Sequence, residues 1–312
     1  MNNIEDVVMI GAGPSSLTAA IYTTREGINT TLYEKGVVGG LAATTDKVDN
    51  YPGFPDGIEG IALAEKMQKQ AERFGTKIEF GEVESIRTED DLKVLVIDGK
   101  EVKARAVLIA TGTGYAKIGA PGELEYYGRG VHYCATCDGA FYRGKKIIVV
   151  GGGNSAVQEA LFLTKFANHV DLLVRSTVRA NTVLQHELQQ KVEKNIITVH
   201  LNTTVDEIVA KNDRVALVRI MKCGEPEEIK TDGVFIFAGL KPNTQFLKGS
   251  GIELDELGFI KTDCNLQTNI TGVFASGDVR SGSTMQIASA VGEGATAALS
   301  IREYLSNANH NL

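Results

Sequence analysis

The sequence lacks the features of membrane, secreted and polyanion-binding proteins. It has no apolar run near the roughly 18 residues that a membrane span needs, and no basic stretch before its first apolar run. We therefore expect neither a membrane span nor a signal peptide. Four cysteines are too few for the disulfide framework of a secreted protein, which indicates a cytoplasmic location. The net charge of −7, without Lys/Arg clusters, argues against a nucleic-acid partner.

Proline is scarce, with 6 residues, and glycine is abundant, with 34, which indicates many tight turns between strands and helices. Two stretches, residues 5–36 and 145–176, share one pattern: a short apolar run, a glycine turn, an amphipathic helix and a second β-branched run. The apolar runs do not alternate with polar residues, which is typical of parallel strands covered on both faces. The sequence therefore predicts an α/β fold with two Rossmann-like, three-layer dinucleotide-binding domains.

The second of these domains is expected to be inserted into the first. Short turns near 113–118 and 240–245 mark the boundaries, so that residues 1–114 and 244–312 form one discontinuous domain and residues 115–243 form the other. Two short connections that cross at one place would also form a hinge. Elsewhere we predict two antiparallel meanders and a C-terminal helix, at residues 77–105, 196–231 and 288–308 respectively.

A glycine turn follows the first apolar run. Gly11 permits the tight turn from strand to helix, and Gly13 lets the backbone approach a pyrophosphate at the helix N-terminus. The third position of the pattern, normally glycine, is the small residue Ser16. Glu34 ends the second strand, where a carboxylate can bind a ribose hydroxyl. These residues predict an FAD or NAD site, the alternative being a purely structural turn.

The second glycine turn has the same form but a different partner. Residues 151–156 read GGGNSA, with alanine in the third position. The following strand ends near Arg175 instead of an acid, and Arg179 lies just beyond it. Because a guanidinium can bind a 2′-phosphate through two hydrogen bonds, this turn predicts an NADP site. The alternative for both arginines is a solvated strand end.

The sharpest local pattern is CATCDG at residues 134–139. Cys134 and Cys137 are spaced to close a disulfide, and a helix N-terminus at this point would lower a thiol pKa. The adjacent Asp138 can carry the proton that thiol–disulfide exchange requires. The pattern predicts a redox-active dithiol, with a structural disulfide as the alternative.

A metal site is not expected. A zinc site needs a second cysteine pair, or cysteine and histidine, at short spacing, whereas Cys223 and Cys264 are isolated. The five histidines share no ligand spacing, so His132 and the others are expected to be surface or packing residues.

Together these motifs resemble the low-molecular-weight thioredoxin reductases nearly from end to end. The resemblance implies FAD in the split domain, NADPH in the inserted domain, and a homodimer. It also implies electron transfer from NADPH to flavin, then to the Cys-x-x-Cys disulfide and on to thioredoxin. The motifs that carry it are GAGPSS (11–16), YEKGVVGGLAATT (33–45), NYPGF (50–54), ATG (110–112), CATCDG (134–139), GGGNSA (151–156) and ASGDV (275–279).

The resemblance also implies the roles of individual residues. Cys137 would be the flavin-proximal thiol, Cys134 the thiol that attacks substrate and Asp138 the acid, and Phe141 could meet thioredoxin. The implied FAD residues are Gly11, Gly13, Pro14, Ser15, Ser16, Glu34, Lys35, Gly39, Gly40, Leu41, Thr44, Asn50, Thr111, Gly112, Gly277, Asp278, Met285, Gln286 and Ile287. The implied NADPH residues are Gly151, Gly153, Asn154, Ser155, Ala156, Arg175 and Arg179.

One signature departs from the family pattern. The family has His-Arg-Arg and a later arginine where this chain has Val174-Arg175-Ser176 and Arg179. NADH, or a donor without nicotinamide such as ferredoxin, is therefore an alternative to NADPH. The motifs are also compatible with a reductase that serves a different thioredoxin-like partner, and with a non-catalytic flavin-binding sensor. The intact cysteine pair with its neighbouring acid argues against the sensor.

Overall fold

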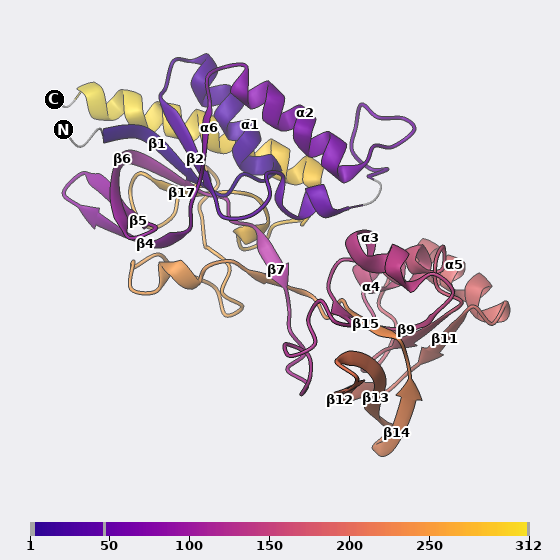
Figure 1. Cartoon of the computed structure of the whole chain (residues 1–312). Coiled ribbons are helices and arrows are strands. Elements are labelled where there is room, and N and C mark those ends of the chain that lie inside the picture. Colours follow the sequence, from indigo (N-terminus) through magenta and orange to yellow (C-terminus); the bar gives the residue numbers. More distant parts are fainter. Residues whose placement is uncertain (1–3, 46–47, 311–312) are drawn as a thin grey trace. The chain divides into compact units, whose positions relative to one another are not determined.

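The computed structural model describes residues 4–45 and 48–310, excluding the side chains of Cys137 and of residues 308–310. The chain divides into unit 1, comprising Met1–Gly114 and Lys241–Leu312, and unit 2, comprising Tyr115–Leu240. Each unit has a sheet of mainly parallel strands with helices packed against it (Figure 1). The predicted α/β fold with two Rossmann-like parts is confirmed.

Unit 1 is built around a seven-stranded sheet. Its elements are β1 (Ile4–Ile10), α1 (Pro14–Arg25), β2 (Thr30–Glu34), η1 (Gly40–Thr44), α2 (Gly60–Glu72), β3 (Lys77–Phe80), β4 (Val83–Glu89), β5 (Leu92–Ile97), β6 (Lys100–Ile109), η3 (Gln245–Leu247), β17 (Val273–Ala275), η4 (Gly277–Val279) and α6 (Ile287–His310). The sheet order is β3-β2-β1-β6-β5-β4, and β17 also pairs with β6. The C-terminal helix is confirmed as α6.

The meander predicted over residues 77–105 is only partly correct. Strands β4, β5 and β6 pair antiparallel, as expected. Strand β3, in contrast, pairs parallel with β2, with Tyr33 opposite Glu79. Because helix α2 carries the chain across the sheet before β3, this strand re-enters in the same direction as β2. Its alternating pattern reflects exposure at the sheet edge.

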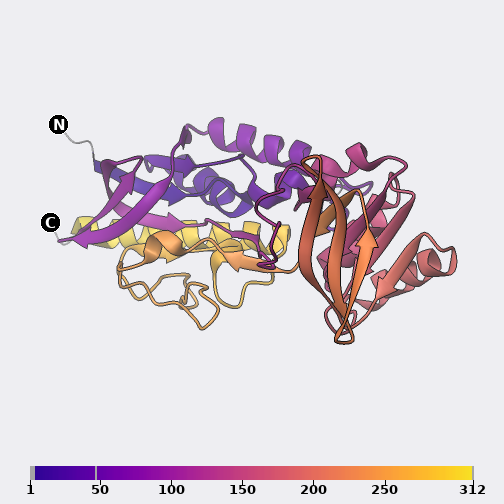
Figure 2. The same ribbon diagram turned by 60° about the horizontal axis from the view of Figure 1, so that its bottom comes forward.

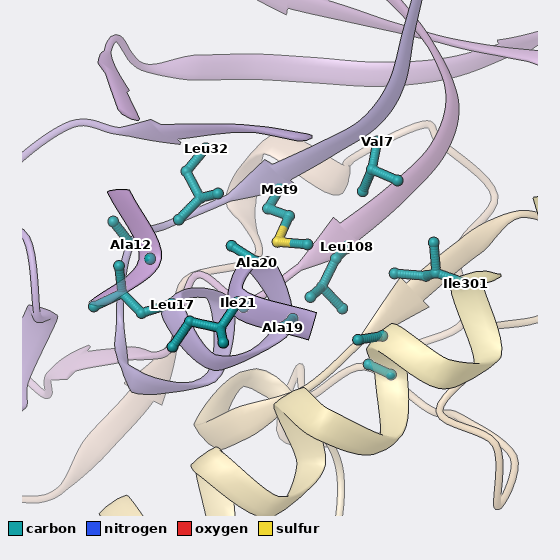
Figure 3. Packing of buried hydrophobic residues seen from close by; sticks show 14 of the residues in the cluster. Val7, Met9, Ala12, Leu17, Ala19, Ala20, Ile21, Leu32, Leu108 and Ile301 are labelled. Atoms are coloured by element: carbon teal, nitrogen blue, oxygen red, sulfur yellow. The ribbon is translucent and has the colours of Figure 1, made fainter. Parts of the chain in front are cut away.

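The core of unit 1 positions the first glycine turn. Figure 3 shows Met9 and Leu108 extending from strands β1 and β6 toward the helices, where Ala20 and Ile301 pack. A fully buried side chain such as Met9 contributes about 1.5–3 kcal/mol to folding. In α6, a Cβ on Gly294 would overlap the backbone oxygen of Ser15, so glycine is needed for the close approach of α6 to the start of α1.

Unit 2 contains a five-stranded parallel sheet and a separate three-stranded antiparallel sheet, the latter visible as brown and orange strands in Figure 2. The orders are β11-β10-β9-β15-β8 and β12-β13-β14. The elements are β8 (Val131–His132), α3 (Ala135–Asp138), η2 (Gly139–Tyr142), β9 (Lys146–Val150), α4 (Asn154–Leu163), β10 (His169–Leu173), α5 (Thr182–Glu193), β11 (Ile197–His200), β12 (Thr203–Lys211), β13 (Arg214–Lys222), β14 (Glu225–Lys230) and β15 (Gly233–Ile236).

The meander predicted over residues 196–231 is confirmed from β12 to β14 and wrong for β11. Strand β11 pairs parallel with β10, with Val170 opposite Ile197. Helix α5 precedes β11 and makes the crossover that a parallel pair requires. Both errors have the same cause: a half-exposed edge strand has an alternating pattern whichever way it runs.

The connections between the units are two short segments. They contain strands β7 (Thr113–Tyr115) and β16 (Leu240–Pro242), which form a two-stranded sheet. Just beyond β16, Asn243 Nδ2 donates to the carbonyl of Thr111 at 2.9 Å, and Thr111 Oγ1 donates to the carbonyl of Asn243 at 2.8 Å. These bonds group residues 241–243 with unit 1, whereas the sequence-based boundary assigns them to the inserted domain.

Within the described residues, no helix combines the length and the apolar character needed to cross a bilayer.

Candidate active site

The first glycine turn, residues 11–16, connects β1 to α1. Gly11 has a φ of +92°, and a Cβ there would lie 2.7 Å from the carbonyl oxygen of Ala110, so glycine is required by backbone conformation and by space. A Cβ on Gly13, in contrast, would meet nothing within 4 Å. The protein itself thus leaves room at Gly13, as expected where a phosphate group approaches the backbone. Pro14 begins the helix, a position that suits its fixed φ.

Two serines at the start of α1 are buried. Ser15 Oγ lies 2.6 Å from Ser276 Oγ, and a Cβ on Gly277 would lie 3.1 Å from Ser15 Cβ, so the turn before η4 adjoins the glycine turn. Ser16 occupies the third motif position, and its buried hydroxyl has no hydrogen-bond partner among the described residues. Its side chain therefore packs inward, which leaves its backbone N–H as the group available to a ligand.

Asp278 lies in η4, one residue beyond Gly277. Burial raises the pKa of Asp278, and the nearby Glu293 adds to the rise, while a hydrogen bond from Ser283 opposes it. Glu293 is itself held by Arg280 Nη2 at 2.6 Å and by the Gly277 N–H at 2.8 Å. This network fixes the η4 backbone beside the first glycine turn, with the Asp278 carboxyl suited to bind hydroxyl groups.

The carboxylate of Glu34 is hydrogen-bonded to the first glycine turn. Its Oε2 accepts a 2.7 Å hydrogen bond from the N–H of Ala12, and its Oε1 accepts a 2.8 Å bond from the N–H of Gly36. The predicted acid is therefore at the turn, and its free lone pairs can accept bonds from a ribose. Lys35 instead points to Glu82, with which it forms an exposed 3.1 Å ion pair.

The remaining predicted flavin residues of unit 1 lie within residues 39–44, at Asn50, and at residues 111–112 and 285–287. Asn50 Nδ2 donates to Gln286 Oε1 at 2.9 Å, which joins the segment before α2 to the start of α6. Gly39 has a φ of +100°, and a Cβ there would overlap Ala64 of α2, so the turn before η1 requires glycine. Gly40, Leu41 and Thr44 lie in η1, Thr111 and Gly112 follow β6, Met285 precedes α6 and Ile287 begins it.

The second glycine turn opens onto a cavity of about 520 Å³ in unit 2. Gly151 has a φ of +143°, and a Cβ there would overlap the carbonyl oxygen of Phe237, whereas a Cβ on Gly153 would meet nothing within 4 Å. This repeats the arrangement of the first turn. The structure brings all the predicted residues to this cavity, namely Gly151, Gly153, Asn154, Ser155, Ala156, Arg175 and Arg179.

Sequence reasoning missed other residues that line this cavity. Segment 237–239 follows β15, and the glycine that ends its apolar run is the signal that could have marked it. No local pattern indicates Lys117, Ile118 or residues 203–205, because these reach the cavity only through the folding of unit 2.

The cysteine motif lies between β8 and β9. Cys134 is disulfide-bonded, while Cys223 and Cys264 are free and exposed. The side chain of Cys137 is outside the described part of the structure. Helix α3 has only 4 residues, so its dipole contributes little to thiol reactivity. Among the described residues, no group of three or more His, Cys, Asp or Glu is arranged to hold a metal ion.

His132 is buried, in agreement with the packing role that the sequence allows, and it also contacts the predicted catalytic acid. Its Nδ1 lies 2.9 Å from Asp138 Oδ2, and its Nε2 lies 2.7 Å from the hydroxyl of Tyr142. Burial lowers the pKa of His132, although Asp138 opposes this, and burial together with Asp138 raises the pKa of Tyr142 to about 12. This buried packing residue is therefore also bonded to the predicted catalytic acid, a contact that the sequence did not indicate.

The chain belongs to the pyridine nucleotide-disulphide oxidoreductase family, whose model matches residues 5–294. Within this family it is a low-molecular-weight thioredoxin reductase by similarity, as the sequence motifs predict. It is 43% identical to thioredoxin reductase of Bacillus subtilis, over 99% of this chain and 97% of that one.

Two solved structures support this assignment. The thioredoxin reductase of Lactococcus lactis has a TM-score of 0.91 at 40% identity, covering 97% of this chain and 99% of that one. The thioredoxin reductase of T. acidophilum has a TM-score of 0.88 at 38% identity, covering 97% and 98% respectively.

Proposed function

We propose that this chain is a thioredoxin-disulfide reductase that uses FAD to pass electrons from NADPH to the disulfide of Cys134 and then to thioredoxin. The observation that carries the proposal is a disulfide-bonded Cys134 beside Asp138, in a chain with two dinucleotide-type glycine turns. A disulfide reductase needs these parts: two nucleotide sites and an exchangeable disulfide with a proton donor.

The first turn and its surroundings fit FAD. The space beside Gly13 suits the pyrophosphate, Glu34 suits the ribose, and Asp278 suits the hydroxyls of the ribityl chain. When bound, FAD supplies two-electron transfer between nicotinamide and disulfide. The residues of unit 1 contribute by binding and orienting it.

The second turn and its cavity fit a phosphorylated dinucleotide. Gly153 leaves room for a pyrophosphate, and Arg175 and Arg179 both line the cavity. Guanidinium groups bind phosphate strongly, whereas a ribose without a 2′-phosphate is usually bound by an acid. We therefore favour NADPH over NADH as the donor.

The dithiol chemistry uses both cysteines and Asp138. The thiolate of Cys134 attacks one sulfur of the substrate disulfide, the substrate S–S bond breaks, and the departing sulfur takes a proton from Asp138. Cys137 loses its proton to solvent and attacks the sulfur of Cys134 as a thiolate, which restores the internal disulfide and releases the second substrate sulfur, protonated from solvent. Two electrons pass from the dithiol to the substrate.

The decisive experiment is anaerobic mixing of the purified flavoprotein with NADPH. We expect NADPH to bleach the flavin absorbance and oxidised thioredoxin to restore it. The control is Cys137→Ser, which should retain FAD but not reduce thioredoxin. A flavin bleached by NADH alone, or by neither nucleotide, would contradict the proposed donor, and a bleached flavin that thioredoxin does not reoxidise would contradict the proposed partner.

We further propose a cytoplasmic homodimer. A thioredoxin reductase works where dithiols are kept reduced, which is the cytosol. Sedimentation of the flavoprotein should give about twice the 33.5 kDa chain mass. A monomer at all concentrations would contradict the dimer without affecting the proposed activity.

A further inference from the structure

Both ring nitrogens of His132 have a polar partner, and the ring stacks on that of Phe235. It lies in the edge strand β8, directly opposite Phe235 of β15. The two rings stack, with centroids 5.1 Å apart and planes inclined by 28°. Nδ1 meets Asp138 and Nε2 meets Tyr142, so both nitrogens have a partner. A ring bonded in this way has one orientation.

The contact with Tyr142 points to one tautomer of His132. The raised pKa of Tyr142 keeps its O–H, and we assign that O–H as the donor to Nε2, which makes Nε2 the acceptor. Burial lowers the pKa of His132, which favours the neutral imidazole, and with Nε2 as the acceptor the proton is assigned to Nδ1, 2.9 Å from Asp138 Oδ2. Every polar group in the chain from Tyr142 through His132 to Asp138 is then satisfied.

The packing around Tyr142 is equally specific. A Cβ on Gly233 of β15 would overlap the Tyr142 ring, so the ring occupies space that only glycine leaves free. The charged groups that face it are Asp138, Arg214 and Asp232, and Lys145 Nζ lies 5.4 Å from the ring centroid.

We propose that His132 is a positioning residue that holds the carboxyl of Asp138 in the orientation for proton transfer at the Cys134 disulfide, with its tautomer set by Tyr142. The proposal rests on the proposed function, in which Asp138 is the proton donor. When Asp138 has given its proton to the departing sulfur, its carboxylate keeps the hydrogen bond from Nδ1–H of His132 and regains a proton from solvent. The Asp138 side chain is 29% exposed, which allows that exchange.

The first test is independent of enzymatic activity. Nitrogen-15 NMR of histidine-labelled protein distinguishes the two neutral tautomers, and His132→Asn identifies the signal among the five histidines. We expect His132 to be neutral with the proton on Nδ1, the less common form in solution. In Tyr142→Phe, which lacks the hydroxyl, we expect the Nε2 signal to shift. A proton on Nε2 in the parent protein would overturn the proposal.

The second test measures how fast dithiothreitol reduces the Cys134 disulfide in the purified flavoprotein. The exposed thiols of Cys223 and Cys264 are first blocked with N-ethylmaleimide, and new thiols are then counted with a labelled maleimide. Because the thiolate fraction of dithiothreitol also changes with pH, each variant's rate is divided by the parent's rate at the same pH.

Two substitutions of His132 test the contacts of its two ring nitrogens separately. His132→Gln places its amide toward Tyr142 and loses the donor to Asp138, whereas His132→Asn keeps an N–H near the Nδ1 position. We expect a rate about tenfold lower for His132→Gln, the effect of one lost hydrogen bond to a charged group, and a loss within about threefold for His132→Asn.

The matched control is His200→Gln. His200 Nε2 lies 2.7 Å from Asp171 Oδ1 at the other edge of the same sheet, far in sequence from the cysteines, and its loss should leave the rate unchanged. Equal rates for His132→Gln and His132→Asn at every pH would overturn the positioning role. If the variants behave as expected while the parent does not reduce thioredoxin, the proposed function fails and the positioning of Asp138 remains.

Discussion

The two glycine turns have the same backbone design but different charges at the adjacent strand end. In both, the first glycine lies against a backbone carbonyl, that of Ala110 or of Phe237, and the glycine two residues later, Gly13 or Gly153, has open space beside it. At the first turn the adjacent side chain is Glu34, bonded to the turn itself, and at the second it is Arg175, lining a cavity. The comparison indicates a division of roles that we propose for both sites: the turn admits a pyrophosphate, and the strand-end residue selects the nucleotide.

The largest expected effect tests the shared backbone design. Gly11→Ala and Gly151→Ala each force a Cβ into a carbonyl oxygen at a positive φ. We expect each to lower the free energy of unfolding of its own unit by about 3 kcal/mol or more, since strain and overlap add. Urea denaturation followed by circular dichroism measures the change. An unchanged midpoint in either variant would show that the two turns are not built alike.

The next prediction concerns the glycine two residues after the first in each turn, Gly13 and Gly153. Gly13→Ala and Gly153→Ala meet no protein atom, so we expect unfolding free energies within about 1 kcal/mol of the parent. Each added methyl should instead crowd the pyrophosphate, weakening ligand binding by about 2 kcal/mol.

Gly13→Ala should weaken FAD alone and Gly153→Ala the nicotinamide nucleotide alone. Flavin release on dilution and titration calorimetry with NADP⁺ distinguish these outcomes. A variant that loses both ligands, or neither, would contradict the expectation that each turn binds one of them.

A smaller effect is expected from removing the positive charges of Arg175 and Arg179 near the second glycine turn. Arg175→Ala and Arg179→Ala should each lower kcat/KM with NADPH about tenfold, because each removes a charge-assisted bond to phosphate. With NADH, which lacks the 2′-phosphate, the same variants should change little and serve as their own control. Equal losses with both nucleotides would mean that the arginines bind a part common to them.

The smallest effect concerns the buried charges of the two units. Glu123 of unit 2 accepts bonds from the N–H groups of Ile118 and Gly119 and from the hydroxyl of Tyr133. Lys93 of unit 1 is 2% exposed and donates to the carbonyl of Asp91 at 2.9 Å. Glu123 thus has more hydrogen bonds to its charged group than Lys93 has. Burial lowers the pKa of Lys93, while the negative charge of Asp91 opposes this shift.

A lowered lysine pKa has a defined consequence for stability. Between that pKa and 10.5 the unfolded chain binds more protons than the folded chain, so the free energy of unfolding rises with pH across this window. Lys93→Met should remove this slope and stabilise unit 1 at neutral pH by up to about 1 kcal/mol. Urea denaturation at neutral and at alkaline pH measures both. A destabilised Lys93→Met at both values would contradict the expectation.

Much of the fold and site could be predicted because contiguous residues carry the signal. The turns at residues 11–16 and 151–156 follow from glycine spacing next to apolar runs, and the disulfide at Cys134 follows from the cysteine spacing. The antiparallel strands β4 to β6 and β12 to β14 follow from alternation and turn residues. In each case the pattern reflects the backbone conformation of one continuous segment.

The contacts between segments were decided by the tertiary structure alone. Strands β3 and β11 run parallel to their neighbours because helices carry the chain across the sheet before them. His132 reaches Asp138 and Tyr142 because β8 pairs with β15 in a register that places its ring on Phe235. The amino-acid sequence determined which local turns and elements form, since these depend on neighbouring residues. Packing decided which side chains meet, because burial acts between residues that are distant along the chain.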